Sequence, residues 1–276
     1  MFLNLKVGFF DKKLWREFGS LIAVAGTFLS TFYSFFEIDE KLKIYIFWLF
    51  IAAALFIFLF KWYRKNNLYC QSFKINDTLI EVKIGDIFNE KGLKIIPFNE
   101  YFDTLVDNEI ISSKSLNGIF LTKILNKNEV KEFESLIEEK KKQSIKKNES
   151  RTKGNKEKFE LGTMIKYKDF LCFAFSKFDE YNRAQLSYKD YISFLFDLWL
   201  EVDKIYSQRC ICIPLIGSGI TRFNNNNNIN EQDLIKTILW TFKLSGIKLK
   251  EPAKVKIVIS EDKKDKINFY KLKEEY

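Results

Sequence analysis

Two uncharged apolar runs lie close together near the start of the chain, at residues 18–36 and 44–60. At about 1.5 Å per helical residue, each run reaches roughly 25 to 29 Å, close to the thickness of a bilayer core. We therefore expect a transmembrane hairpin over residues 1–67, with spans at 18–36 and 44–62, and one head domain over residues 68–276. The alternative is a pair of buried core helices in a soluble fold, which the shortness of the second run leaves open.

Basic residues flank the outer ends of the predicted hairpin: Lys12, Lys13 and Arg16 before it, and Lys61, Arg64 and Lys65 after it. The connector at residues 37–43 carries three acids and two bases. By the positive-inside rule both chain ends are cytoplasmic, as in a two-pass protein of the inner cell membrane. Trp15, Trp62 and Tyr63 stand where aromatic anchors prefer to lie.

Small residues recur every four positions along the first run, at Gly19, Ala23, Thr27 and Thr31. Such a stripe permits close helix packing in lipid, either against the second span or against another copy. Two short spans cannot enclose a channel. We therefore expect a homo-oligomer in contact with membrane lipid.

The net charge of +9 limits the partners of the chain. Residues 1–67 contribute +4, from nine bases and five acids, and the rest contributes +5. This charge suits anionic lipid or a phosphate-bearing ligand. A nucleic acid is not expected, because the lysines are interspersed with acids and no identified loop combines aromatic with basic residues.

The chain has four cysteines and no histidine. The lack of histidine excludes Ser-His and Cys-His catalysis and removes the commonest metal ligand. Only Cys210 and Cys212 lie close together, which is too few for a four-cysteine zinc site. Reduced thiols are expected in a cytoplasmic head, without a metal or a cofactor.

Strand and helix patterns alternate along the head. Strands are predicted at 79–88 and 93–98, two more within 161–178, and others at 210–216 and 254–260. Helices are predicted at 116–125 and 129–147, after a cap at Ser187, and between Asn230 and Gly246. The polar stretch 146–158 is predicted as an exposed loop. This order indicates an α/β fold with a mixed sheet and helices on both faces.

Ligands of α/β sheets collect at the carboxyl ends of strands. Four positions there are candidates: residues 85–87, 98–99, 216–222 and Ser260. The turn IGSGITR offers unhindered N–H groups for phosphate oxygens, and Arg222 adds charge. The simpler interpretations are a tight turn at Gly217 and Gly219, and a turn or helix cap at Asp86.

These motifs resemble the macro domain, an α/β fold that binds ADP-ribose. More closely, two spans followed by GDIF, IIPFNEYFDT, SSKSLNGIF and IPLIGSGITRF are similar to the membrane-anchored macro effectors of Thoeris antiphage defence. The resemblance implies that Asp86 holds the adenine amine and that Asn99 and Asp103 face the distal ribose. It implies these ligand contacts: Asp86, Ile87, Asn99, Glu100, Asp103, Ser115, Leu116, Asn117, Gly118, Ile216, Gly217, Ser218, Gly219, Ile220, Thr221 and Arg222.

The family resemblance also implies a function. A partner TIR-domain enzyme makes an ADP-ribose-derived signal from NAD, and its binding to the head triggers membrane disruption and the death or growth arrest of the infected cell. The loop FNEYFD departs from the small-residue stretch of typical macro domains, so Glu100 or Asp103 is expected to meet a positive amine on a modified ligand. The alternative function is a membrane-anchored ADP-ribosyl hydrolase.

Overall fold

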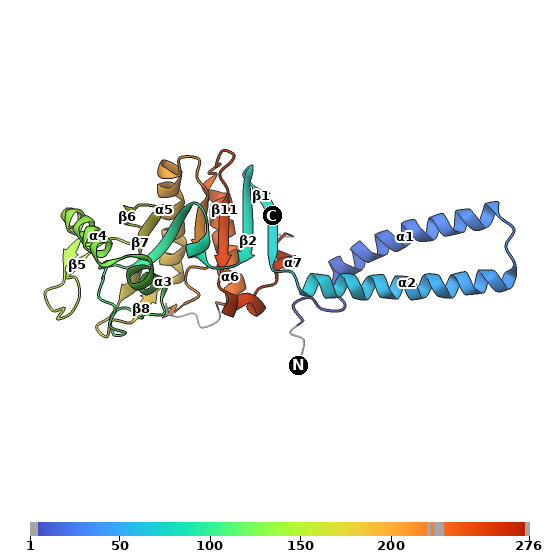
Figure 1. Ribbon diagram of the computed structural model, residues 1–276, viewed down its shortest axis with the longest axis horizontal. Coiled ribbons are helices and arrows are strands. Elements are labelled where there is room, and N and C mark those ends of the chain that lie inside the picture. The colour runs from blue at the N-terminus through green and yellow to red at the C-terminus, as the bar shows by residue number, and fades with distance from the viewer. Residues whose placement is uncertain (1–4, 220–221, 224–228, 274–276) are drawn as a thin grey trace. The chain divides into compact units, whose positions relative to one another are not determined.

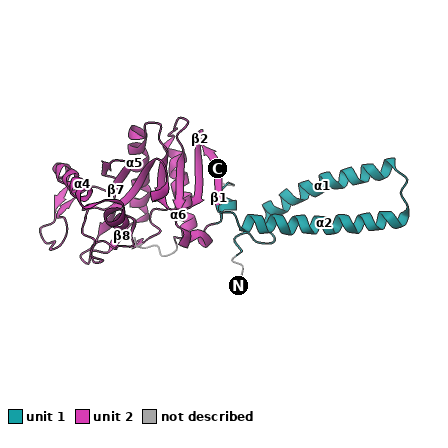
Figure 2. Cartoon of the chain, viewed as in Figure 1, with its two compact units in different colours: residues 1–69, 268–274 teal, residues 70–267, 275–276 magenta. Residues whose placement is uncertain are grey.

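A computed structural model describes residues 5–219, 222–223 and 229–273. The chain divides into two compact units (Figure 2): residues 1–69 with 268–274, and residues 70–267 with 275–276. The short C-terminal segment, which the sequence placed in the head, is thus grouped with the N-terminal helices.

The first unit is built on two long helices, α1 (Lys12–Phe35) and α2 (Glu40–Asn66), labelled in Figure 1. The side chains of Asp11 and Asp39 cap them by accepting hydrogen bonds from backbone N–H groups of the first turns. Both helices are long and apolar enough to cross a membrane. Most of their apolar side chains are exposed, whereas a core helix of a soluble protein would bury them.

The serine and threonine hydroxyl groups on α1 are satisfied within the helix. Thr27 and Thr31 donate hydrogen bonds to carbonyl oxygens four residues earlier, at 2.9 and 2.8 Å, and Ser34 does so at 3.0 Å. These hydroxyls therefore need no water, a requirement for any segment that lies in lipid.

Segments from both chain ends meet at the base of the two helices. Tyr270, on α7 (Phe269–Leu272), packs into a small core with residues of α1 and α2. Its hydroxyl donates to Glu17 at 3.1 Å, and the ammonium groups of Lys13 and Lys65 lie 4.4 and 4.5 Å from its ring centre. α7 is thus an integral part of this unit.

The second unit contains a mixed sheet. Its strands are β1 (Cys70–Ile75), β2 (Thr78–Ile84), β3 (Leu93–Asn99), β6 (Met164–Tyr167), β7 (Phe170–Phe178), β8 (Ala184–Leu186), β9 (Ile211–Pro214), β10 (Arg222–Phe223) and β11 (Val255–Ile259). The order is β1-β2-β11-β9-β3-β7-β8-β10, and β6 pairs with β7. Neighbours from β2 to β7 in this order are parallel, so their five carboxyl ends lie along one edge.

Helices cover both faces of this sheet (Figure 1). They are α3 (Leu116–Ile119), which continues as a π turn (Phe120–Ile124), α4 (Lys127–Lys140), α5 (Tyr188–Ile205) and α6 (Glu231–Ser245). Alternate side chains of β7 separate the layers: Cys172 and Ala174 share a core with α4, whereas Phe173 and Phe175 contact Phe194 of α5 at 5.9 and 5.0 Å between ring centres. The predicted α/β class is confirmed.

Several segments differ from the sequence prediction. β8 and β10 were not predicted, and β2 ends at Ile84 instead of residue 88. The helix predicted at 129–147 ends at Lys140 and is followed by a 3₁₀ turn, Lys141–Gln143. Residues 146–158 are not simply an exposed loop, because β4 (Lys146–Lys147) pairs with β5 (Glu157–Lys158) and the turn between them buries Arg151. β1 was missed entirely. The run of asparagines at 224–228, which precedes the predicted helix, lies outside the described residues.

Candidate functional site

A cavity of about 1040 Å³ lies at the carboxyl edge of the sheet. Residues that follow β2, β11, β9, β3 and β7 contribute to it, together with the segment before and within α3. The predicted residues that line it are Asp86, Ile87, Asn99, Ser115, Leu116, Asn117, Ile216, Gly217, Ser218, Gly219 and Ser260. The order of the strands in the sheet sets the order in which these residues lie along the edge. The cavity therefore has an Asp86 end, a glycine-rich middle and an Asn99 end.

Asp86 begins the first end of the cavity. One carboxylate oxygen accepts a hydrogen bond from the N–H of Phe88 at 3.0 Å, which caps the 3₁₀ turn Ile87–Asn89. The side chain is nevertheless exposed at the cavity. The capping role predicted for an acid at this position is therefore present, and the carboxylate can still accept a further hydrogen bond from a ligand.

The glycine-rich middle follows directly after β9. Gly217 has φ +88°, and a Cβ there would lie 2.9 Å from Cζ of Phe223. The carbonyl oxygen of Ile216 accepts a hydrogen bond from the hydroxyl of Tyr191 at 3.1 Å, which fixes the loop to α5. Among the described residues, the N–H groups of Gly217 and Gly219 have no hydrogen-bond partner. They are free donors of the kind that bind phosphate oxygens.

Basic and acidic side chains surround this middle. Lys114, Lys123 and Lys263 line the cavity. Lys263 also reaches Glu231, at the start of α6, at 3.3 Å. Burial alone would raise the pKa of Glu231, but hydrogen bonds, first from Lys266 and then from the backbone and Lys263, hold it below its ordinary value. Glu231 therefore remains a carboxylate at neutral pH.

Asn99 marks the other end of the cavity. A shift of register between β3 and β7 occurs there, since Phe98 pairs with Ala174 and Asn99 pairs with Ser176. Such irregularities redirect side chains. Asn99 is 2% exposed, and its Nδ2 has no hydrogen-bond partner in the described part of the chain. A buried donor without a partner is costly, so this end of the cavity favours a hydrogen-bond acceptor.

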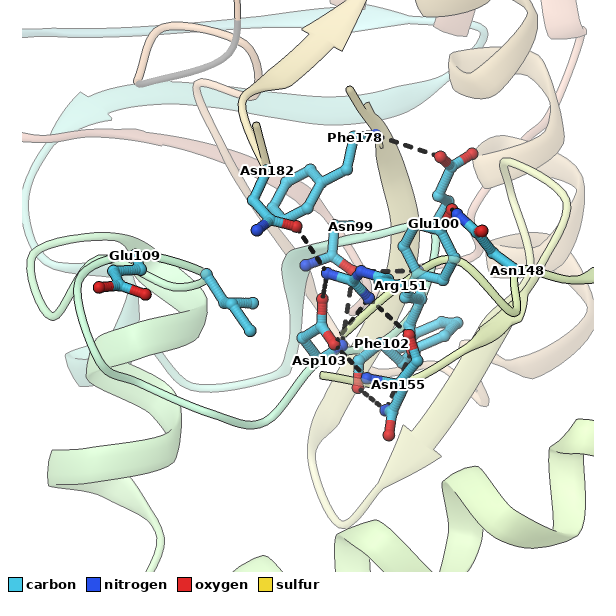
Figure 3. Close-up of polar contacts among 12 residues, drawn as sticks. Asn99, Glu100, Phe102, Asp103, Glu109, Asn148, Arg151, Asn155, Phe178 and Asn182 are labelled. Carbon is cyan, nitrogen blue, oxygen red and sulfur yellow. Dashed lines mark hydrogen bonds and ion pairs between the residues drawn. The ribbon is translucent and has the colours of Figure 1, made fainter. Parts of the chain in front are cut away.

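Glu100 and Asp103 lie outside the cavity lining, although they follow Asn99 closely in sequence. Figure 3 shows the contacts of Glu100 with Phe178 and of Asp103 with Arg151. Glu100 pairs with Lys158 at 3.0 Å and accepts a hydrogen bond from the N–H of Phe178 at 3.1 Å. Asp103 is fully buried and pairs with Arg151. Both carboxylates are already neutralised by bases of the chain, so they are poorly placed to meet an amine on a ligand.

Other predicted residues also fall away from the cavity. Gly118 packs against the Ser112–Ser115 turn, and Arg222 is exposed on β10. Ile220 and Thr221 lie outside the described residues. These residues also line the cavity and were not predicted from the sequence: Ile110, Ile111, Lys114, Lys123, Phe175, Ser176, Phe178, Ala184, Glu261, Asp262 and Lys263. The last three follow the predicted position Ser260 directly, so the strand end at 254–260 could have indicated them.

In the part of the chain that the structure describes, no group of three or more Cys, Asp or Glu side chains could hold a metal ion. The four cysteines are free thiols. Burial raises the pKa of Cys212 to about 11 and that of Cys172 well above its ordinary value, so neither is a ready thiolate.

The sheet and its edge cavity define a macro-type α/β domain. A mutant of the Oceanobacillus iheyensis macrodomain with ADPR has the same fold, with a TM-score of 0.50 and 15% identity over 74% of this chain and 97% of that chain. The family model described as "Thoeris protein ThsA, Macro domain" matches residues 80–260. Thoeris protein ThsA of Bacillus amyloliquefaciens (strain Y2) is 37% identical over 271 residues, which cover 96% of this chain and 90% of that protein. The chain belongs to the Thoeris ThsA family.

Proposed function

We propose that the chain is an antiphage defence effector whose head binds an ADP-ribose-derived signal, made from NAD by a partner TIR-domain enzyme. The observation that carries this is the cavity with free N–H donors at Gly217 and Gly219, in a chain 37% identical to a Thoeris ThsA protein. The related macrodomain of known structure was solved with ADPR. A signal sensor, rather than an enzyme, is the function proposed.

The order of groups along the cavity suits an extended nucleotide. Asp86 accepts from the adenine amine, the glycine-rich middle receives the diphosphate with Ser115–Asn117 opposite, and Asn99 meets the distal sugar. The three strand spacings from β2 to β3 amount to about 14 Å, which separates the adenine end from the sugar end. Lys114, Lys123 and Lys263 add positive charge where the diphosphate lies.

The two helices carry the proposed membrane function. Gly19, Ala23, Thr27 and Thr31 are all exposed on α1, so this small-residue stripe is open to another copy within lipid. Ligand binding would rearrange a homo-oligomer of hairpins in the inner membrane and disrupt it. Both chain ends would be cytoplasmic. Single cysteines placed at Glu37 and at Asn67 of a cysteine-free variant test this topology, because only the first should react with an impermeant maleimide added outside cells.

The proposed function is tested with the full chain in detergent micelles and in lipid vesicles. Calorimetric titration with ADP-ribose and with the NAD-derived products of a TIR enzyme should show binding, with the ligand recovered intact. The product that binds should also release dye from vesicles that contain the protein. Consumption of the ligand would establish the hydrolase instead, and an absence of binding to every nucleotide would refute the proposal.

A further inference from the structure

Arg151 forms a buried ion pair behind the Asn99 end of the cavity (Figure 3). Its guanidinium donates to the two carboxylate oxygens of Asp103 at 3.0 and 2.6 Å, and their side chains are 7% and 0% exposed. It also donates to the Asn182 side chain at 3.1 Å and lies 4.0 Å from the ring centre of Tyr101. Paired forks of this kind fix orientation more strictly than a single contact does.

This pair holds a backbone conformation that the chain does not favour by itself. Phe102 has φ +48°, in the left-handed region that bulky residues avoid. Asn155, near Arg151 in the same turn, donates to the carbonyl oxygens of Tyr101 and Phe102 at 3.1 and 2.9 Å. Its N–H donates to Asp103 at 2.7 Å. Residues of the 151–155 turn thus hold the 101–103 loop by its backbone and by its buried carboxylate.

The loop in turn fixes the carboxamide of Asn99. The N–H groups of Tyr101 and Asp103 donate to Asn99 Oδ1 at 2.9 and 3.4 Å. With Oδ1 occupied by two donors, Nδ2 has to be the group left without a partner at the cavity. If the loop relaxed, the carboxamide would be free to rotate and present an acceptor instead.

The 151–155 turn also contacts two other residues that line the Asn99 end of the cavity. The Arg151 guanidinium lies 5.8 Å from the ring centre of Phe178, which lines the cavity. A Cβ on Gly154 would lie 3.2 Å from the side chain of Ile110, another lining residue, so the turn is in close contact with it. Three of the residues around the sugar end therefore depend on the 151–155 turn.

We propose that Arg151 is a positioning residue that, through Asp103 and the 101–103 loop, sets Asn99 as a fixed donor and so selects ligands with a hydrogen-bond acceptor beyond the diphosphate. This inference rests on the proposed function, because it assumes that the cavity binds an ADP-ribose-type nucleotide. ADP-ribose carries such acceptors on its distal sugar, and ADP ends at the diphosphate. The affinity ratio between these two probes therefore reports on the sugar end of the cavity, and the Asn99→Ala background isolates the part due to Asn99.

The test measures the dissociation constants of ADP and ADP-ribose for the full chain in detergent, in a double-mutant cycle of Arg151→Lys and Asn99→Ala. Lysine keeps the positive charge but loses the fork. Arg151→Lys should reduce the preference for ADP-ribose over ADP about fivefold to tenfold, the worth of one hydrogen bond, with ADP affinity unchanged. In the Asn99→Ala background the same substitution should have no further effect, because Arg151 acts through Asn99.

Two further variants separate positioning from general folding. Arg209→Lys weakens another Arg–Asp pair, with Asp169, at positions that do not line the cavity and do not adjoin a lining residue, and should leave both affinities unchanged. Asn155→Ala loosens the 101–103 loop without leaving a buried charge unpaired, and should lower the same ratio if Arg151→Lys melts too early to assay. Equal losses for ADP and ADP-ribose, or additive effects in the cycle, would overturn the inference while the proposed function stands. If the unaltered chain binds neither probe, the inference fails. The proposed function fails as well only if the chain binds none of the NAD-derived products of a TIR enzyme either.

Discussion

Nζ of Lys263 donates a hydrogen bond to the carbonyl oxygen of Ser218 at 2.6 Å. Lys263 lies on the 3₁₀ turn Glu261–Lys266 that follows β11, and Ser218 lies between the two glycines after β9. The bond ties the Ser218 carbonyl oxygen to the Lys263 ammonium group. The free N–H groups of Gly217 and Gly219 lie on either side of Ser218 in the chain. The shape of the candidate phosphate loop therefore depends on a side chain 45 residues further along the chain.

Replacing Lys263 tests that dependence. Lys263→Met should weaken ADP-ribose binding about tenfold or more, because a charged hydrogen bond that contributes about 1.5 kcal/mol or more to the loop is lost. Calorimetric titration of the full chain measures the effect. The control is Lys266→Met, since Lys266 shares Glu231 with Lys263 and is not bonded to the loop. Equal losses in the two variants would show that Glu231, and not the Ser218 bond, is what matters.

Gly217→Val should abolish nucleotide binding while the head stays folded. A valine would be strained at φ +88° and would press on Phe223, at a combined cost of about 1 to 3 kcal/mol, and the loop would shift to relieve it. Gly246→Ala provides the matched control, because Gly246 has φ +69°, open space around it, and no place at the cavity. Thermal unfolding and titration of both variants check this. Normal binding by Gly217→Val would refute the assignment of the phosphate loop.

Stability should fall in acid partly through Glu231. The pKa of its carboxyl is lowered in the folded chain, so its contribution is complete above the ordinary value of 4.5 and is lost as the pH falls through the folded value. Glu231→Gln should therefore be less stable than the natural chain at pH 7, and the difference should shrink as the pH falls below 4.5. Melting temperatures from pH 3 to pH 7 measure it, with the exposed Glu139→Gln as the comparison. A difference that stays constant with pH would contradict the assignment.

The thiols should react in an order set by burial. Cys70 is exposed, whereas Cys172 and Cys212 are buried with raised pKa values. At pH 7.5, N-ethylmaleimide should modify Cys70 first and leave Cys172 and Cys212 unmodified until the head unfolds. Mass spectrometry of the native and denatured chain follows the order. Rapid native labelling of Cys212 would mean that β9 is not a buried central strand.

Much of the fold could be predicted because strong local signals agree with the tertiary structure. The ends of two helices could be predicted almost to the residue, from the capping residues Ser187 and Asn230 and from Gly246, which has a left-handed conformation. The buried strands β9 and β11 were evident from short apolar runs. Weakly patterned edge elements were not, since β1 is a mostly exposed strand whose pairing with β2 supplies what its sequence lacks.

The candidate site was predictable where it depends on strand ends and glycines, as at Asp86, Asn99 and Gly217. Glu100 and Asp103 show the limit. Both are acids beside a predicted pocket residue, and nothing local indicates that Lys158 and Arg151, about 50 residues away, neutralise them. Charge can be counted from a sequence, but the pairing of charges over such distances is decided only by the folded chain.

Because α7 belongs to the first unit, the head domain is a loop inserted between two parts of that unit. The chain leaves this unit after Tyr69 and returns to it at Asn268, so contacts of Tyr270 with α1 and α2 close a loop of about 200 residues. For an unfolded segment of that length, closure would cost about 4 to 5 kcal/mol of chain entropy. A folded head has already brought its two ends into a fixed relation. The contacts of α7 with α1 and α2 should therefore become less stable when the head unfolds. The stability of the first unit thus depends on the folding of the second.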